Sequence, residues 1–384
     1  MKNVDLYQTN LSNKVIKFSL YFGIALFPLY IFDSGTIQIS HFSLLIFSIF
    51  VLTIVGITHN RYIYIFGFFL LYSIIVSIFY IYYELYFTRD FVNKHLIDVL
   101  YLTYNFILTT SLISYFSYQK KFNIILYGLI TSLLILMFSW LYEFFIGLNN
   151  FRFTGFFNNP NQLGYFTVCC FSIVYLFYRN SYISFTFMIS LKSILIFFSI
   201  LSLSKAAYIS LILCFIVALK PFNYKYSKIV WIIFLTLIII FFIIFFQQIS
   251  DTIFYKRIIN LPHENDTSLE VRGYYVLFEA NFLQAIFGMG LKNVYSLHNS
   301  VEIHSTFAMI LASYGLVGFF IFSLLMFFWV LDINKAYGLF GLICVCAPTL
   351  LYGLTHNGIR FSIFWILFAL SVFMSKEYIL NKKS

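Results

Sequence analysis

Residues 304–331 read HSTFAMILASYGLVGFFIFSLLMFFWVL and contain no Asp, Glu, Lys or Arg. A helix of about 20 apolar residues crosses the ~30 Å hydrocarbon core of a bilayer. The stretch is long enough for such a crossing, and it opens on the polar pair His304-Ser305. We therefore predict a transmembrane helix that begins with a histidine at the membrane surface.

Comparable apolar runs recur along the whole chain. The sequence of 384 residues is 61% hydrophobic and 10% charged, whereas soluble domains carry about 25% charged residues. A β-barrel would instead show alternating segments of about 10 residues. We predict an all-α, polytopic transmembrane helical bundle that forms a single integral membrane domain over residues 1–384. Its spans, about twelve, are expected at 15–33, 38–57, 62–83, 96–116, 123–146, 162–178, 182–203, 204–219, 229–247, 304–331, 338–355 and 360–375.

The distribution of positive charge predicts the orientation of these spans. The formal net charge is +10, and basic cytoplasmic loops explain it better than a nucleic-acid partner does. With both termini in the cytoplasm, the short cytoplasmic loops hold most of the Lys and Arg residues, as expected for a multi-pass membrane protein. Lys192 falls inside the span 182–203, so either its side chain snorkels to the surface or that span is misplaced.

The sequence contains no motif that predicts a cofactor or metal site. The five cysteines all fall in predicted spans and lack zinc-type spacing, so we interpret them as small buried hydrophobic residues. No Gly-rich phosphate-binding loop for ATP is present. We therefore expect an activity that uses neither a metal nor a cofactor.

Residues 248–303 form one long polar loop on the predicted outer side, in a chain whose other loops are mostly short. Long loops of this kind often carry function. Within it, Ser268–Phe287 has helical periodicity and ends at Gly288-Met289-Gly290. We predict a helix over these residues that lies along the outer membrane surface.

A second segment on the predicted outer side, residues 152–164, reads RFTGFFNNPNQLG and joins the spans 123–146 and 162–178. Its glycine and its Asn-Pro pair predict a turn. Asn161 is a candidate N-cap for the helix that follows.

Four cations on the predicted outer side, Arg152, Lys205, Arg272 and Arg360, are candidate anion-binding residues. Each also has a structural interpretation: an interfacial arginine that binds lipid head groups for Arg152, snorkelling for Lys205, a solvated helix face for Arg272 and an interface anchor for Arg360. A planar guanidinium suits phosphate oxygens. A lysine between apolar spans without a nearby acid favours a bound anion.

His304 is the candidate general base. An imidazole with an ordinary pKa near 6.5 accepts a proton at pH 7. Ala308, Ala312 and Gly315 continue its helix face with small residues that allow close helix packing. His298 is the competing candidate, and a purely structural histidine at a span end is the alternative. Cations that hold a dianionic leaving group, with a histidine that activates a hydroxyl, favour a lipid diphosphate as the substrate.

Four sequence patterns resemble those of the bacterial O-antigen ligase and O-antigen polymerase family. Arg152-x-x-Gly155 with Asn159-Pro160-Asn161-x-x-Gly164 is similar to the family's loop of the same form. Ser204-Lys205-Ala206 stands where the family usually has Ser-Arg-Gly or Ser-Arg-Ala. Arg272 with Gly288-x-Gly290 resembles the Arg and Gly-x-Gly of the family's long outer loop. His304-Ser305-x9-Gly315-x2-Gly318 fits the family's pattern in the span that follows that loop.

This resemblance implies metal-independent glycosyl transfer at the periplasmic face of the inner membrane, in surface polysaccharide or lipopolysaccharide biosynthesis. The donor would be a glycan on undecaprenyl diphosphate. The acceptor would be lipid A-core for a ligase, or a second lipid-linked repeat unit for a polymerase. His304 would act as base, while Arg152, Lys205 and Arg272 hold the diphosphate, with Asn161, His298 and Arg360 nearby.

Two other functions remain open. A flippase for lipid-linked oligosaccharides also has about twelve spans, although transporters favour charges at the bilayer midplane and internal repeats. A non-catalytic scaffold would use the basic residues and small-residue helix face only to bind membrane lipid and pack.

Overall fold

The computed structural model describes residues 2–32, 36–87, 93–119, 121–146, 152–218, 273–298 and 303–383. Within these ranges the chain forms helices and no strand, which confirms the predicted all-α class. The predicted span 229–247 lies outside them. The longer helices are α1 (Lys2–Ala25), α2 (Ile39–Ile54), α3 (Arg61–Phe87), α4 (Asn93–Tyr118), α5 (Asn123–Ile146), α6 (Pro160–Arg179), α7 (Phe185–Ser202), α8 (Lys205–Ala218), α15 (Thr306–Gly341) and α17 (Ser362–Lys383).

Short elements complete the described fold. They are the 3-10 helices η1 (Tyr274–Phe278) and η3 (Gly358–Arg360), the helices α13 (Phe282–Phe287) and α14 (Leu291–Leu297), a π-helical turn η2 (Leu342–Cys346) and α16 (Ala347–Thr355).

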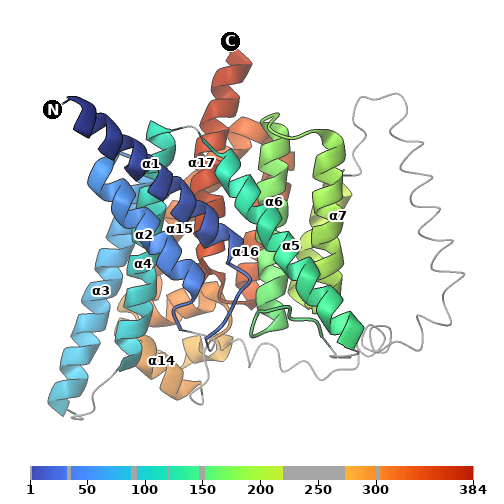
Figure 1. The fold of residues 1–384 in the computed structure, drawn as a ribbon. Coiled ribbons are helices and arrows are strands. Elements are labelled where there is room, and N and C mark those ends of the chain that lie inside the picture. The colour runs from blue at the N-terminus through green and yellow to red at the C-terminus, as the bar shows by residue number, and fades with distance from the viewer. Residues whose placement is uncertain are drawn as a thin grey trace, which may run out of the picture.

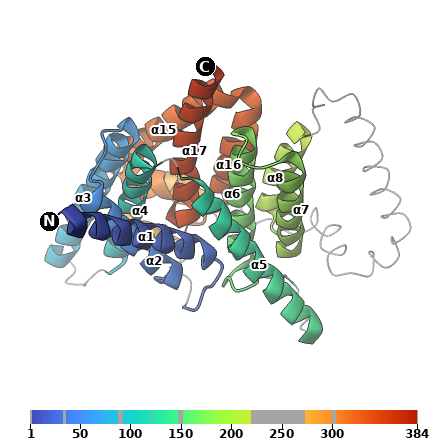
Figure 2. The ribbon, with the colours of Figure 1, turned by 45° about the horizontal axis from the view of Figure 1, so that its top comes forward.

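The long helices run between two ends of one bundle (Figure 1). Both chain termini lie at the upper end in this view, which we call the terminus end. The short helix α14 lies at the lower end, which we call the α14 end. In the turned view, α8 lies beside α6 and α7 (Figure 2), and contacts join all three helices.

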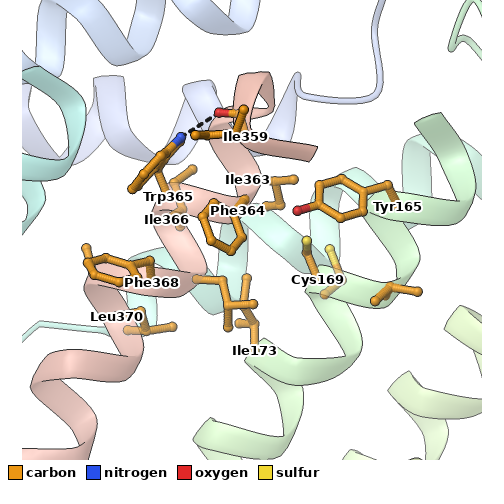
Figure 3. Close-up of a cluster of buried hydrophobic side chains, with 14 of the residues drawn as sticks. Tyr165, Cys169, Ile173, Ile359, Ile363, Phe364, Trp365, Ile366, Phe368 and Leu370 are labelled. Carbon is orange, nitrogen blue, oxygen red and sulfur yellow. Dashed lines mark hydrogen bonds between the residues drawn. The ribbon is translucent and has the colours of Figure 1, made fainter. Parts of the chain in front are cut away.

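The centre of the bundle is the helix pair α6 and α17. Every residue from Leu163 to Phe177 of α6 is buried, and α17 is buried over most of its length. Figure 3 shows aromatic and aliphatic side chains of α17, among them Phe364 and Phe368, packed against Tyr165, Cys169 and Ile173 of α6. α5 is more apolar than α17 but less buried, so packing by neighbouring helices, and not composition, places α6 and α17 in the core. The indole of Trp365 also donates to the Ile359 carbonyl at 2.7 Å, which closes the start of α17.

Six helices of the described residues are long and apolar enough to cross a membrane, which is the pattern of a multi-pass membrane protein. The predicted spans within the described ranges all overlap helices, so their positions follow from sequence. The first is placed too far along the chain, because α1 ends at Ala25. Pro28 disfavours helical backbone at the residue before it. Twelve crossings stay a prediction.

Lys192 lies within α7, a helix that is long and apolar enough to cross a membrane and that overlaps the predicted span 182–203. Its ammonium lies over the rings of Phe171 and Tyr175 of α6, at 4.3 and 5.4 Å from the ring centroids. Ring faces attract cations, and this contact lowers the cost of a charge among apolar helices.

The predicted span after His304 does not form one straight helix. Gly315 and Gly338 of α15 have positive φ angles of 64° and 67° with non-helical ψ, so the chain bends at both. The bend at Gly338 falls at the first residue of the predicted span 338–355. Residues 306–314 therefore form a short separate helical segment. Ala308 and Ala312 are buried on it, while Gly315 lies at the bend and does not continue the helix face.

A backbone clamp closes the bend at Gly315. The amides of Met289 and Gly290 donate to the carbonyls of Ala312 and Ser313 at 2.9 and 3.1 Å. A Cβ on Gly315 would overlap the backbone of Gly288 and Ile286, so the two segments approach each other backbone to backbone at this point.

Two tyrosines of α3 complete the clamp. The hydroxyls of Tyr72 and Tyr80 donate to the carbonyls of Phe287 and Gly288, at 2.9 and 2.8 Å. The clamp therefore ties the segment 286–290 to both α15 and α3.

The predicted surface helix over Ser268–Phe287 is wrong in its described part. Gly273 has a φ of 71°, η1 ends at Phe278, and Asn281 starts α13 with a capping box to Gln284. The predicted stop at Gly288 is confirmed, because α13 ends at Phe287. Residues 248–272 lie outside the described ranges, and the length of the loop and its position on the membrane remain predictions.

Alanine substitutions distinguish the stability lost by disrupting the clamp from the stability lost through a positive φ angle alone. Backbone in this region of φ and ψ costs a non-glycine residue about 1–3 kcal/mol. Gly338→Ala meets no atom within 4 Å and should lose only this amount. Gly315→Ala adds overlap with the backbone of Gly288, so we expect a clearly larger drop in melting temperature of the detergent-purified protein. Equal drops for the two variants would contradict the clamp.

Candidate functional site

The segment 152–164 is a turn built by its small and amide residues. Gly155 has a φ of 58°, which favours glycine. The side chain of Asn159 accepts from the Asn161 amide at 2.8 Å and caps α6, with Pro160 in the first helical position. The predicted cap at Asn161 is therefore wrong by two residues. Proline favours the first position inside a helix, which makes the residue before it the cap.

Asn161 instead orients Arg152. The guanidinium of Arg152 donates from Nη2 to the Asn161 side-chain oxygen at 3.0 Å. It also donates from Nε to the Ser202 carbonyl at 3.0 Å, and from Nη2 to the Leu203 carbonyl at 3.4 Å. These bonds join the turn before α6 to the turn between α7 and α8. Two of the four motif regions therefore meet in one hydrogen-bonded group.

Lys205 is the first residue of α8, directly after that second turn. Leu203 has a φ of 50° and closes α7, so the chain reverses within two residues. Gly164 allows α6 to approach this turn, because a Cβ there would lie 3.0 Å from Cβ of Ser204 and 3.2 Å from Cβ of Ala207. The motif glycine thus brings Lys205 beside the start of α6.

Tyr352 of α16 connects this group to the rest of the α14 end. Its hydroxyl donates to the Asn161 carbonyl at 2.5 Å and lies 3.5 Å from the Ser204 hydroxyl. Its ring packs on Tyr165 of α6, with ring centroids 4.7 Å apart. One buried side chain therefore contacts both turns.

Four residues beyond Tyr352, the imidazole of His356 lies against the tyrosine ring, with ring centroids 4.7 Å apart. The His356 carbonyl accepts from the Thr306 hydroxyl at 3.0 Å, and that hydroxyl accepts from the Gly358 amide at 2.8 Å. Thr306 begins α15, two residues after His304. Contacts therefore run without a gap from Arg152 through Asn161, Tyr352 and His356 to the helix start next to His304.

His304 itself is exposed, whereas Ser305 beside it is buried. The Ser305 hydroxyl caps α15 by accepting from the Ala308 amide at 3.2 Å, and it lies 2.9 Å from the hydroxyl of Tyr274. Tyr274 also donates to the Leu354 carbonyl at 2.7 Å. The backbone that carries His304 is thus anchored, while its imidazole reaches solvent.

His298, unlike His304, is buried, and its imidazole contacts other side chains of the loop. It is 5% exposed, and its Nδ1 lies 3.0 Å from the hydroxyl of Tyr275. A Cβ on Gly273 would lie 3.3 Å from the His298 ring. These contacts give His298 a structural role in the loop.

Arg360 forms an ion pair with Asp98 of α4, whose side chain is 2% exposed. Asn105 of α4 donates to the Ile359 and Arg360 carbonyls at 3.3 and 3.2 Å. A buried carboxylate needs such a partner. The arginine therefore ties η3 to α4. These bonds do not link it to the Arg152 group, and its predicted roles in anion binding or at the membrane interface stay predictions.

The remaining candidate, Arg272, lies outside the described residues. Sequence reasoning missed Tyr352, His356 and Tyr274, which connect the motifs. The signal for the first two was present: Tyr352 and His356 are four residues apart at the end of a predicted apolar span, just before Asn357-Gly358. Within the ranges that the structure describes, no three His, Cys, Asp or Glu side chains are placed to hold a metal ion.

No protein-family model matches the sequence, and a search of curated proteins finds no match either.

The role of Tyr352 can be tested by hydrogen exchange. Tyr352→Phe removes the bond to Asn161, worth about 1 kcal/mol, so we expect amide exchange over residues 152–164 to rise about fivefold. The control is Tyr337→Phe, which removes the 2.8 Å bond from Asn180 at the terminus end. Exchange in 152–164 should be unchanged in the control. An identical exchange pattern in both variants would contradict the role of Tyr352 in connecting the two turns.

Proposed function

We propose that the protein transfers a glycan from undecaprenyl diphosphate to an acceptor hydroxyl at the α14 end of the bundle. In this proposal the bundle spans a bacterial inner membrane, the α14 end faces the periplasm and both termini are cytoplasmic. The acceptor is lipid A-core for a ligase, or a second lipid-linked repeat unit for a polymerase.

The supporting observation is the group of contacts that joins motif residues far apart in sequence. Arg152 bonds to Asn161 and to the turn before Lys205. Tyr352 then joins Asn161 to the helix turn that ends at His356, which in turn bonds Thr306 beside His304. The proposed chemistry comes from the sequence resemblance, and these contacts support a shared site for Arg152, Asn161 and the helix start beside His304.

The cations would bind the leaving group. Arg152 is oriented by bonds to neutral carbonyl and amide oxygens, and Lys205 follows it at the adjacent turn. Oriented cations at a site of developing negative charge stabilise the transition state. In the proposed reaction, these residues and Arg272 hold the diphosphate while the bond between the glycan's anomeric carbon and the diphosphate oxygen breaks.

The base would be His304. The acceptor hydroxyl oxygen forms a new bond to the anomeric carbon, its proton passes to the imidazole, and undecaprenyl diphosphate leaves with the electron pair of the broken bond. An exposed imidazole on an anchored helix start suits this task, because a base must reach the substrate's proton. The buried position of His298 makes it the weaker candidate.

Purified variants in proteoliposomes test these roles. With a lipid-diphosphate-linked glycan as donor, His304→Ala should lower the transfer rate about 10²-fold or more, the usual contribution of general base catalysis. Arg152→Ala should lower it by about 10²–10³-fold. Lys335→Ala, which removes an exposed cation from the terminus end, should leave the rate unchanged. Normal transfer by folded His304→Ala and Arg152→Ala proteins would end the proposal.

A gel of surface glycans separates the two acceptors. After deletion of the gene, a ligase predicts polymer that accumulates on the carrier and is lost from lipid A-core. A polymerase predicts single repeat units on lipid A-core. A normal ladder in the deletion strain would exclude both.

A flippase for lipid-linked oligosaccharides is the second candidate, and the bend at Gly315 is the observation that favours it. Transporters often use discontinuous helices at their substrate site, and residues 306–314 form such a short segment. The segment lies at one end of the bundle instead of its middle, which favours transfer. Movement of a labelled lipid-linked glycan across vesicles without any acceptor would support the flippase.

A further inference from the structure

A cavity opens at the terminus end, on the opposite side of the bundle from His304. Its volume is about 410 Å³, which lies within the ~300–1,000 Å³ range of small-molecule sites. Three helices supply its walls: His59, Asn60 and Arg61 at the start of α3, Asp332 of α15, and Ser375 and Lys376 of α17.

Positive charge dominates the lining. Arg61 and Lys376 are cations, and Asp332 is the one carboxylate among the lining residues. Asp332 Oδ2 accepts from Arg61 Nη2 and from the Tyr62 hydroxyl, each at 2.6 Å. The carboxylate therefore points to the wall of the cavity. Its charge offsets that of Arg61, and the three charged residues of the lining leave a net charge of +1.

The backbone adds to this field. α3 begins at Arg61 and runs to Phe87, so its N-terminus presents the positive end of a long helix dipole to the cavity. The guanidinium of Arg61 is also held over the rings of Tyr62 and Phe328, at 5.0 and 4.8 Å from their centroids. The cation is thus oriented before any ligand binds.

Apolar surface continues from the cavity along α3. Nδ1 of His59 bonds to the hydroxyl of Tyr64, which places that ring at the cavity edge. Tyr64 and Phe68, one helical turn apart, are 51% and 65% exposed. A ligand with a charged group in the cavity could therefore lay a hydrocarbon chain along this face.

We propose that the cavity binds a phosphate group, carried by the head group of an anionic membrane phospholipid. Basic pockets between transmembrane helices bind such head groups, and the exposed rings of α3 are placed to contact the acyl chains. The site is distinct from the proposed transferase site and does not depend on that activity.

Native mass spectrometry of the detergent-purified full chain tests this site. The probes are dioleoylphosphatidylglycerol, dioleoylglycerol with the same acyl chains and no phosphate, and inorganic phosphate. The test variant is Lys376→Gln, which removes an exposed lining cation and leaves the Arg61–Asp332 pair intact. Its control is Lys335→Gln, which removes an exposed cation of α15 that is not part of the lining.

We expect phosphatidylglycerol to bind about fivefold more weakly to Lys376→Gln than to the unaltered chain. Lys335→Gln should bind it as the unaltered chain does, and dioleoylglycerol should not distinguish the proteins. If inorganic phosphate alone binds and shows the same dependence on Lys376, the phosphate site stands but a soluble anion is its ligand. Equal binding of both phosphate-bearing probes to all three proteins would overturn the proposal.

Discussion

Two hydrogen bonds, from the amides of Met289 and Gly290 to the carbonyls of Ala312 and Ser313, hold the α14 end together. A helix that bends at Gly315 leaves backbone groups without helical partners, and an apolar environment offers no water to replace them. The segment 286–290 supplies the donors, and only glycine at 288 and 315 allows the two backbones to approach this closely. The position of residues 306–314, and so of His304, depends on this clamp.

The motif residues divide between building the site and doing its proposed chemistry. Gly155, Asn159 and Gly164 shape the turn, cap α6 and admit the neighbouring helix. These tasks explain their types without any ligand. Arg152, Lys205 and His304 are the residues that the scaffold presents, and the proposed transfer assigns chemistry to them. The proposed role of His304 rests on its surroundings, because Ser305 anchors the backbone beside it and its imidazole is exposed.

The arginines at the two ends of the bundle have different surroundings. Arg360 is paired with a buried carboxylate and ties helices together. Arg61 is also paired, but its partner Asp332 accepts a second hydrogen bond from Tyr62. Lys376 adds a further positive charge to the cavity that Arg61 and Asp332 line. Counting charged residues along the chain does not distinguish these cases. The distinction depends on which acidic side chain folds against which cation.

The sequence by itself determined the helical class and the approximate bounds of most helices, because apolar length and Pro, Gly and Asn breaks act locally. Periodicity failed over residues 273–287, where Gly273 and the Asn281 capping box divide the segment despite its pattern. Only the tertiary structure decided that Tyr352 contacts Asn161 and that Asp98 pairs with Arg360, since residues so far apart meet through packing of whole helices. The site and the cavity are products of that packing, and no local rule in the chain encodes them.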